Sequence, residues 1–171
     1  MERVIQGLVE HLTALPEPLI TFVIATLPVS ELRGAIPWAL TAGGLQWQQA
    51  YFYAVLGNFL PVVPLLLLLE PISLRLRKYS IWDRFFSWLF ERTRRRSQVV
   101  ERYEALGLIL FVAIPLPVTG AWTGTIAAFI FGIRFRLAVP AILAGIFIAG
   151  AVVTLAWLGV LGAVFQFLVG R

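Results

Sequence analysis

Two long apolar stretches are typical of helices that cross a bilayer. Residues 47–69 carry no charged side chain, and a helix of that length spans the hydrocarbon core. We expect this helix to end at residues 70–71, a glutamate and a proline. Residues 137–169 are also uncharged and would measure ~50 Å as one helix, against a core of ~30 Å. This length predicts one span followed by a short terminal helix, with the break near Gly159 or Gly162.

Two other segments are amphipathic. In residues 1–15, apolar side chains recur at helical spacing, which indicates a short helix in the membrane interface. Residues 71–104 carry nine arginines and lysines against four acids, and a wide aromatic face lies between Ile81 and Phe90. A basic helix with such a face binds an anionic membrane surface. We therefore interpret residues 71–104 as an amphipathic linker helix in contact with membrane lipids, and not as a nucleic-acid site.

The remaining apolar segments are broken in the middle. Residues 16–44 are interrupted by a polar cluster at 27–34, and residues 105–131 by a proline-rich stretch at 114–120. Lipid cannot satisfy the backbone groups that proline leaves without partners. The 11 residues at 18–28 make ~16 Å of helix, about half the membrane. We therefore predict two re-entrant hairpins, whose breaks are expected at Pro28, Gly34, Pro37, Pro115, Pro117, Gly120 and Gly124.

The two broken segments are related by an internal repeat. Leu27-Pro28-Val29-Ser30 recurs as Leu116-Pro117-Val118-Thr119 after 89 residues, and Gly43 matches Gly132 at the same displacement. The sequence thus predicts an all-α integral membrane protein with a single membrane domain. Each repeat consists of a re-entrant helical hairpin and a transmembrane helix. The expected order is an interfacial helix at 1–15, repeat 1 at 16–70, the basic linker at 71–104 and repeat 2 at 105–171.

The positions of the basic residues indicate how the chain crosses the membrane. If both broken segments re-enter, the linker and the pair Arg134 and Arg136 lie on one side, and the acidic N-terminal region lies on the other. Full crossings would place the two basic regions on opposite sides. Because cytoplasmic loops carry an excess of arginine and lysine, hairpins are favoured and the linker is expected in the cytoplasm. The repeats then have inverted orientation in the inner (cytoplasmic) membrane, as in many secondary transporters.

Composition excludes several classes of protein. With 60% apolar and 13% charged residues and a mean hydropathy of +0.87, the chain cannot form a water-soluble fold. The absence of cysteine excludes disulfides, iron–sulfur clusters and thiolate zinc sites, and one histidine, His11, argues against a histidine metal site or a catalytic triad. We expect no enzymatic activity, no metal and no cofactor. Two spans and two half-spans enclose little of a pathway, so a homodimer is expected.

Two charged residues, Glu31 and Arg33, lie in the first break. Each charge at bilayer depth costs ~2.5–3.5 kcal/mol on insertion scales. The pair therefore indicates either a transport site or a structural ion pair that stabilises the tip. Residues two apart do not share a helix face, but a non-helical tip would let them pair. In the transport interpretation Glu31 is the protonatable group, Arg33 binds an anionic head-group through its guanidinium fork, and Ser30 adds a hydroxyl.

The second break supplies uncharged polar groups. Thr119, Trp122 and Thr123 are candidate substrate contacts, and Thr119 and Thr123 are four residues apart, so they could share one helix face. Threonines in membrane helices also bond back to their own backbone, which is the alternative role. Asn58 lies in the middle of the first span and is a candidate for substrate or ion binding, or for a hydrogen bond between helices.

Two motifs resemble those of a known family. They are Pro-Val-Ser-Glu-Leu-Arg-Gly-Ala-Ile-Pro at residues 28–37 and Pro-Leu-Pro-Val-Thr-Gly-Ala-Trp-Thr-Gly-Thr at residues 115–125. Over about residues 16–160 the chain resembles the small multidrug export protein family, which implies a drug exporter. More remotely, the paired breaks resemble the DedA membrane proteins, which implies movement of lipid-linked phosphates by two re-entrant hairpins. Glu31 and Arg33 match the acid and the arginine of such hairpins, whereas the second break has threonines where a DedA protein carries further arginine.

Three functions fit these features. The first is ion-coupled export of small amphipathic molecules through a midplane site formed by both hairpins, with Glu31 exchanging a proton for substrate; sodium is the other candidate ion. The alternative is a translocase, or flippase, for phosphate-bearing lipids such as polyprenyl phosphates or phospholipids, with Arg33 holding the head-group. The third is a scaffold or lipid-surface regulator that acts through the basic linker.

Overall fold

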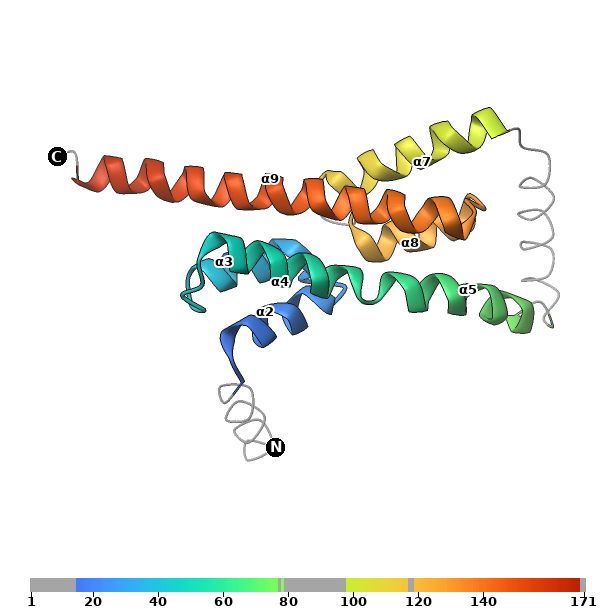
Figure 1. The fold of residues 1–171 in the computed structure, drawn as a ribbon, viewed down its shortest axis with the longest axis horizontal. Coiled ribbons are helices and arrows are strands. Elements are labelled where there is room, and N and C mark those ends of the chain that lie inside the picture. The colour runs from blue at the N-terminus through green and yellow to red at the C-terminus, as the bar shows by residue number, and fades with distance from the viewer. Residues whose placement is uncertain (1–14, 77, 79–97, 117–118, 170–171) are drawn as a thin grey trace. The chain divides into compact units, whose positions relative to one another are not determined.

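The computed structural model describes residues 15–76, 78, 98–116 and 119–169, and all regular structure within them is helical (Figure 1). The predicted all-α fold is confirmed for this part of the chain. The interfacial helix predicted at 1–15 and most of the basic linker predicted at 71–104 lie outside the described residues. The helices are α2 (Glu17–Thr26), α3 (Glu31–Leu40), α4 (Trp47–Phe59), α5 (Val62–Leu76), α7 (Gln98–Ala113), α8 (Ala121–Ile130) and α9 (Phe135–Val169).

The chain divides into two compact units. Unit 1 comprises residues 1–58 and 150–171, and unit 2 comprises residues 59–149. Unit 1 contains α2, α3, α4 and the C-terminal part of α9, whereas unit 2 contains α5, α7, α8 and the N-terminal part of α9. Each unit therefore includes one pair of short helices and one part of each long apolar stretch.

In unit 1, α2 and α3 pack against each other and are joined by only four residues. Pro18 lies in the first turn of α2, where its missing N–H removes no helical hydrogen bond. The helix ends before Pro28, because the residue that precedes a proline is disfavoured in the α conformation, and Leu27 is extended (φ −76°, ψ 135°). Each of the two helices has ten residues, which corresponds to ~15 Å of length.

In unit 2, α7 and α8 form the second pair. α8 ends at Ile130, and two residues later Gly132 has a left-handed φ of +64°. The N–H of Ile133 donates to the carbonyl of Ala128 at 2.8 Å. After α3 the left-handed glycine is Gly44, with φ +60°. The backbone equivalent of Gly132 is therefore Gly44, one residue beyond the Gly43 of the sequence match. Both short pairs are thus followed by a left-handed glycine, but the turns differ: the N–H of Ile133 donates five residues back, whereas the N–H of Leu45 donates six residues back, to Ala39.

Some predicted break points are wrong. Gly34 and Pro37 lie inside α3, and Gly124 lies inside α8. A Cβ on Gly34 would lie 2.7 Å from Cβ of Ser30, so this glycine permits a close approach between the tip and its own helix and does not end the helix. The other predicted breaks, Pro28, Pro115 and Gly120, lie in the connections as expected, and Pro117 lies outside the described residues.

The first long stretch, Trp47–Leu69, is apolar and long enough to cross a membrane, but it consists of two helices. The break at residues 60–61 follows from covalent structure, because Pro61 has no N–H to donate to the carbonyl of Gly57. The predicted end at residues 70–71 is wrong, since α5 continues through this proline to Leu76. Pro71 removes one helical hydrogen bond but does not stop the helix. Glu70 ends the run of apolar residues but not the helix.

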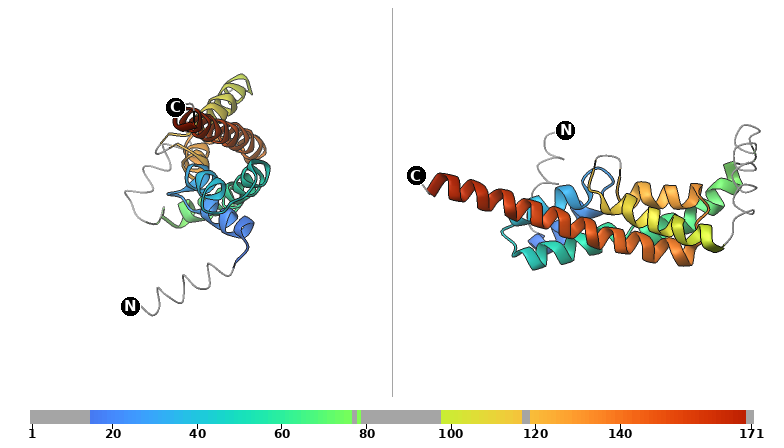
Figure 2. Two further views of the ribbon diagram at one scale, coloured as in Figure 1. Left: turned by 90° about the vertical axis from the view of Figure 1, so that its left-hand side faces the viewer. Right: turned by 90° about the horizontal axis from the view of Figure 1, so that it is seen from above.

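The second long stretch is one uninterrupted helix, α9 (Figures 1 and 2). The predicted break near Gly159 or Gly162 is wrong. A glycine inside a helix costs only ~1 kcal/mol relative to alanine, and no proline follows Pro140 in α9. The apolar part that could cross a membrane is Phe135–Gly159, so the structure has two candidate membrane-spanning helices in the described chain.

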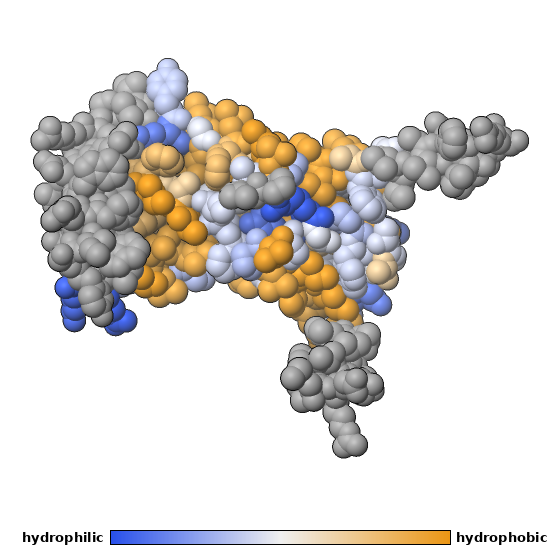
Figure 3. Space-filling model, turned by 180° about the vertical axis from the view of Figure 1, so that it is seen from behind, coloured by the Kyte–Doolittle hydropathy of each residue, from blue (hydrophilic) through white to orange (hydrophobic). Residues whose placement is uncertain are grey.

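Small residues set the distances between helices within each unit. In unit 2, a Cβ on Gly124 or on Gly145 would lie 2.4 or 2.6 Å from the side chain of Val112, so α7, α8 and α9 converge there. In unit 1, a Cβ on Gly57 would lie 2.2 Å from the carbonyl oxygen of Phe22 in α2. Apolar side chains cover much of the described surface (Figure 3). Close backbone contact is how helices associate where no hydrophobic effect drives them together.

Replacing Gly57 by alanine should therefore destabilise unit 1. Because the added methyl group meets backbone atoms that cannot rotate away, we expect a loss of ~1–3 kcal/mol, measured as thermal unfolding of the purified protein in detergent. Gly159→Ala is the matched control, since nothing lies within 4 Å of that position and alanine favours a helix. Equal stability of the two variants would contradict the close approach of α2 and α4.

Candidate functional site

The tip of the first short pair carries a buried acid. Glu31 is the first residue of α3 and is only 5% exposed. Its φ of +45° is a left-handed conformation, which L-residues other than glycine rarely adopt. Its backbone N–H donates to the carbonyl of Leu27 at 3.0 Å, which closes the turn at the tip. Glu31 therefore combines a buried carboxylate with a strained backbone.

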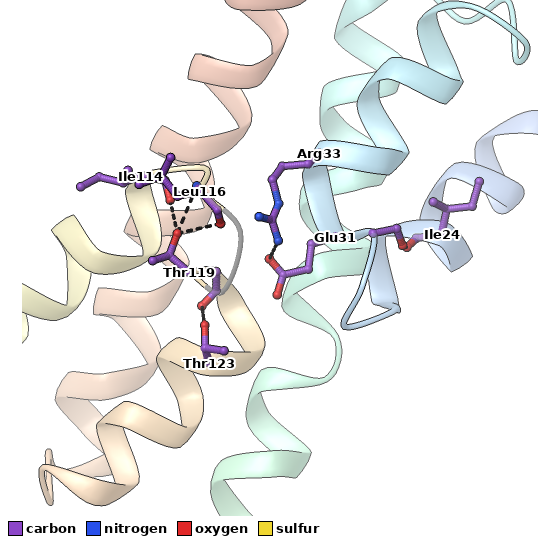
Figure 4. A network of polar contacts seen from close by, with 9 residues as sticks. Ile24, Glu31, Arg33, Ile114, Leu116, Thr119 and Thr123 are labelled. Carbon is purple, nitrogen blue, oxygen red and sulfur yellow. Dashed lines mark hydrogen bonds and ion pairs between the residues drawn. The ribbon is translucent and has the colours of Figure 1, made fainter.

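Glu31 and Arg33 form an ion pair, but both residues lie in α3, so the expectation of a non-helical tip around them is wrong. The distance between Nη2 of Arg33 and Oε2 of Glu31 is 4.0 Å, and the two side chains point toward each other at the start of α3 (Figure 4). The left-handed turn at Glu31 places its side chain differently from that of a regular helical residue, so two residues that would not share a helix face can meet. The side chain of Arg33 is 27% exposed and that of Glu31 is 6% exposed, so the acid is the more buried partner.

A hydroxyl group closes each tip onto the preceding helix. Ser30 donates a hydrogen bond to the carbonyl of Ile24, near the end of α2. Thr119, at the equivalent position of the repeat, lies 2.6 Å from the carbonyl of Ile114 and 3.0 Å from that of Leu116, and accepts the N–H of Leu116 (Figure 4). Each hydroxyl adds a second hydrogen bond to its carbonyl, since Ile24 also accepts the N–H of Leu27 and Ile114 also accepts the N–H of Leu116.

The displacement of 89 residues also relates Glu31 to Gly120. Gly120 has a positive φ as well, +153°, so both tips use a backbone conformation that favours glycine. The second tip has glycine there and the first has glutamate. A left-handed conformation costs an L-residue ~1–2 kcal/mol, and a buried charge adds to that cost. Glutamate is thus unfavourable at this position for two reasons: its backbone is left-handed and its charged side chain is buried.

The other predicted residues of the second tip lie at the start of α8. The hydroxyl of Thr123 lies 3.4 Å from the carbonyl of Gly120, and the buried hydroxyl of Thr125 donates to the carbonyl of Ala121 at 2.6 Å. Trp122 is half-buried in the same turn. The suggestion that Thr119 and Thr123 share a helix face is wrong, because α8 begins only after Gly120 and Thr119 belongs to the connection.

Asn58 is buried in the last turn of α4, at 1% exposure. Within the described part of the chain its Oδ1 atom has no hydrogen-bond partner, so this oxygen does not make the interhelical hydrogen bond that was one of its expected roles. A buried acceptor without a partner is costly and is often a functional group. Sequence reasoning missed two further atoms of this kind in α9, the hydroxyl of Thr154 and the indole nitrogen of Trp157. In the sequence, both residues could have been recognised as polar groups within the long uncharged stretch 137–169.

The strain at Glu31 can be measured by comparing two variants that both remove the carboxylate. Glu31→Gly should be more stable than Glu31→Ala by ~1–2 kcal/mol, because only glycine adopts the left-handed conformation without strain. The measurement is thermal unfolding in detergent. Gly120→Ala is the reciprocal variant and should destabilise unit 2. Equal stability of the two Glu31 variants would mean that the tip does not hold this conformation.

Comparison with known proteins agrees with the first resemblance. The family described as "Putative small multi-drug export protein" matches residues 31–152, which is well over half of the chain and includes the first tip from Glu31 onward. No curated protein and no solved structure matches the chain, so the likeness to DedA proteins gains no support. The name of the matching family agrees with a membrane protein whose described helices include two of spanning length. The chain therefore belongs to the putative small multi-drug export protein family.

Proposed function

We propose that the protein exports small amphipathic molecules across the inner membrane in exchange for an ion, and that Glu31 binds that ion. The observation that carries the proposal is the buried, strained carboxylate at the first tip. A residue held in a sparsely populated conformation persists only where the surrounding structure or its function requires it. The residue 89 positions later in the second tip is a glycine, Gly120, which also has a positive φ, and the first tip nevertheless carries an acid.

A carboxylate at this position can couple two ligands. It binds either a proton or a cationic or hydrogen-bonding part of a substrate, and the two compete for the same oxygen atoms. Binding of one then opposes binding of the other by the same free energy, which is the requirement for exchange. Nη2 of Arg33 lies 4.0 Å from Oε2 of Glu31, so the guanidinium group holds the carboxylate in place. Ser30 and Asn58, which belong to the same unit as Glu31, are the other residues of the proposed site.

We further propose that both short pairs are re-entrant hairpins that enter from opposite sides. The ten-residue helices α2, α3 and α8 each reach about half of the hydrocarbon core, whereas α7 has 16 residues and reaches further. The tips also expose apolar side chains that suit lipid better than water: Leu27 and Val29 are 50% and 90% exposed in the first, and Ile114 and Leu116 are 49% and 56% exposed in the second. The order short helix, short helix, long apolar stretch occurs twice. A homodimer would complete the pathway.

Translocation of phosphate-bearing lipids is the alternative function. It needs a guanidinium group that can accept a phosphate, and Arg33 has one that is 27% exposed. The pairing of this group with Glu31 favours export, because the carboxylate already occupies part of the guanidinium fork. A scaffold would need neither Glu31 nor Arg33 to bind a ligand.

Export predicts that Glu31→Gln abolishes exchange while the protein remains folded. We expect a fall of at least about tenfold in pH-driven transport of an amphipathic fluorophore by proteoliposomes, because glutamine cannot exchange a proton. Glu17→Gln is the matched control, since Glu17 is an exposed acid at the start of α2 and should leave transport unchanged. Unchanged transport and unchanged drug tolerance of cells with Glu31→Gln would reject the proposal.

The same proteoliposomes test the alternative with a labelled phosphate-bearing lipid. Export predicts no protein-dependent movement of this lipid. If instead Arg33→Ala abolished lipid movement and Arg33→Lys partly kept it, the translocase would replace the exporter.

The proposed topology places Gln48 and Arg134 on opposite faces of the membrane. Single cysteines at these two positions give an unambiguous test because the chain has no native cysteine. We expect a membrane-impermeant thiol reagent to label Arg134→Cys only from the cytoplasmic side and Gln48→Cys only from the other. Labelling of both from the same side would exclude the inverted re-entrant arrangement.

A further inference from the structure

Unit 1 contains a pocket between α4 and the C-terminal part of α9. Its volume is about 270 Å³, slightly below the range of pockets that hold drug-sized molecules, so it suits a compact ligand. The residues that line it all belong to unit 1. They are Trp47 and Tyr51 of α4 and Ala151, Thr154, Leu155 and Leu158 of α9.

The spacing of these residues explains why they meet. Those of α9 fall three, four and seven positions after Ala151, and those of α4 are four apart, so each set lies on one face of its helix. Gly150 lets the two helices approach, because a Cβ there would lie 2.9 Å from Cε2 of Tyr51 and 3.2 Å from Cγ2 of Val55. The pocket therefore lies next to a point of close contact between α4 and α9.

The walls of the pocket are apolar. The aromatic residues Trp47 and Tyr51 line it from α4, and Leu155 and Leu158 line it from α9. Trp47 and Leu155 are 51% and 69% exposed, so their surfaces are accessible to a bound molecule. None of the six lining residues is charged. The pocket thus offers a surface for an apolar body and no counter-ion for a charge.

Thr154 contributes a hydroxyl group that has no hydrogen-bond partner within the described residues. The residue is 4% exposed. The other threonines that the structure describes each hold their hydroxyl within hydrogen-bond distance of a backbone carbonyl three to five residues earlier. They are Thr21, Thr26, Thr41, Thr119, Thr123 and Thr125. Thr154 differs from all of them, because its hydroxyl does not bond to the carbonyl of Gly150.

The indole nitrogen of Trp157, three residues further along α9, is also buried without a partner in the described chain. Buried polar groups are hydrogen-bonded in the great majority of cases, and an exception calls for an explanation such as a ligand site. Threonine adopts two side-chain rotamers in a helix, so the hydroxyl of Thr154 can turn toward a molecule in the pocket. A water molecule suits the pocket poorly, since it needs several polar partners and the walls are apolar.

We propose that this pocket binds neutral amphipathic molecules that carry a hydrogen-bonding group, such as phenols, alcohols or amides, and that the protein exports molecules of this class. The apolar part fills the space between the aromatic residues and the leucines, and the polar group bonds to the hydroxyl of Thr154. An ionised molecule is disfavoured, because its charge would be buried among uncharged side chains. The step from binding to export rests on the function proposed above, whereas binding itself does not.

The preference for a neutral ligand is tested with naphthol on the full-length protein in detergent at neutral pH. Bound radiolabelled naphthol is measured by equilibrium dialysis against empty micelles. Unlabelled naphthol should displace it at concentrations at least about tenfold lower than naphthalene sulfonate or naphthylmethylammonium, ions with the same ring system. Displacement by either ion at the same concentration as naphthol would overturn the neutral class.

Thr154→Val tests the hydroxyl, because valine has nearly the same shape as threonine. We expect the affinity for naphthol to fall by about fivefold, as for the loss of one hydrogen bond, and the affinity for naphthalene to stay unchanged. Thr125→Val is the matched control, since Thr125 is equally buried but bonds to its own helix in unit 2. Unchanged naphthol binding by Thr154→Val, or an equal fall for naphthalene, would overturn the role of the hydroxyl.

Ala151→Leu locates the ligand. The larger side chain fills the pocket and should weaken the binding of both naphthol and naphthalene by at least about tenfold. Gly107→Leu adds the same side chain at an open position in unit 2 and should leave both unchanged. Loss of binding in Gly107→Leu and not in Ala151→Leu would place the ligand elsewhere and overturn the proposal. The comparison of naphthol with the two ions decides the ligand class even if Ala151→Leu does not fold.

Glu31→Gln separates this proposal from the proposed function. The variant should bind naphthol as the unchanged protein does, whatever its effect on transport, because Glu31 does not line the pocket. Binding that is kept while transport is also unchanged would reject the role of Glu31 in export and leave the pocket standing. Transport that depends on Glu31 in a protein that binds no naphthol would overturn the pocket and leave the export proposal standing.

Discussion

The satisfaction of backbone hydrogen bonds at the two tips is the constraint on which the rest of the structure depends. A helix that stops in apolar surroundings leaves carbonyl and amide groups without partners, and each such group costs several kilocalories per mole in lipid. Ser30 and Thr119 each contribute a hydroxyl to this requirement, bonded to the carbonyl of Ile24 in α2 and to that of Ile114 directly after α7.

The first tip meets a second requirement that the other does not. At equivalent positions, Gly120 adopts a positive φ without cost, and Glu31 adopts one while its carboxylate is buried against Arg33. Each of these features alone has a structural explanation, since ion pairs and strained turns both occur in proteins without a function. Their combination at one residue, opposite a glycine in the repeat, is what favours a chemical role.

Glycines in the described part of the chain have three different physical roles. Gly57, Gly124 and Gly145 let helices approach closely, Gly44 and Gly132 turn the backbone, and Gly107 leaves open space.

The sequence by itself determined the helical class, the two apolar stretches, the connections at Pro28 and Pro115 and the positions of the polar tip residues. These features depend on local chemistry, namely apolar length, the missing N–H of proline and the repeat at 89 residues. Tertiary structure alone decided where Gly34, Gly124 and Gly159 fit into continuous helices, because a glycine within a sequence does not reveal whether a neighbour needs its space. It also decided that Glu31 adopts a left-handed conformation and that Asn58 buries an oxygen without a partner. Such features depend on contacts between segments far apart in the chain, and no local pattern records them.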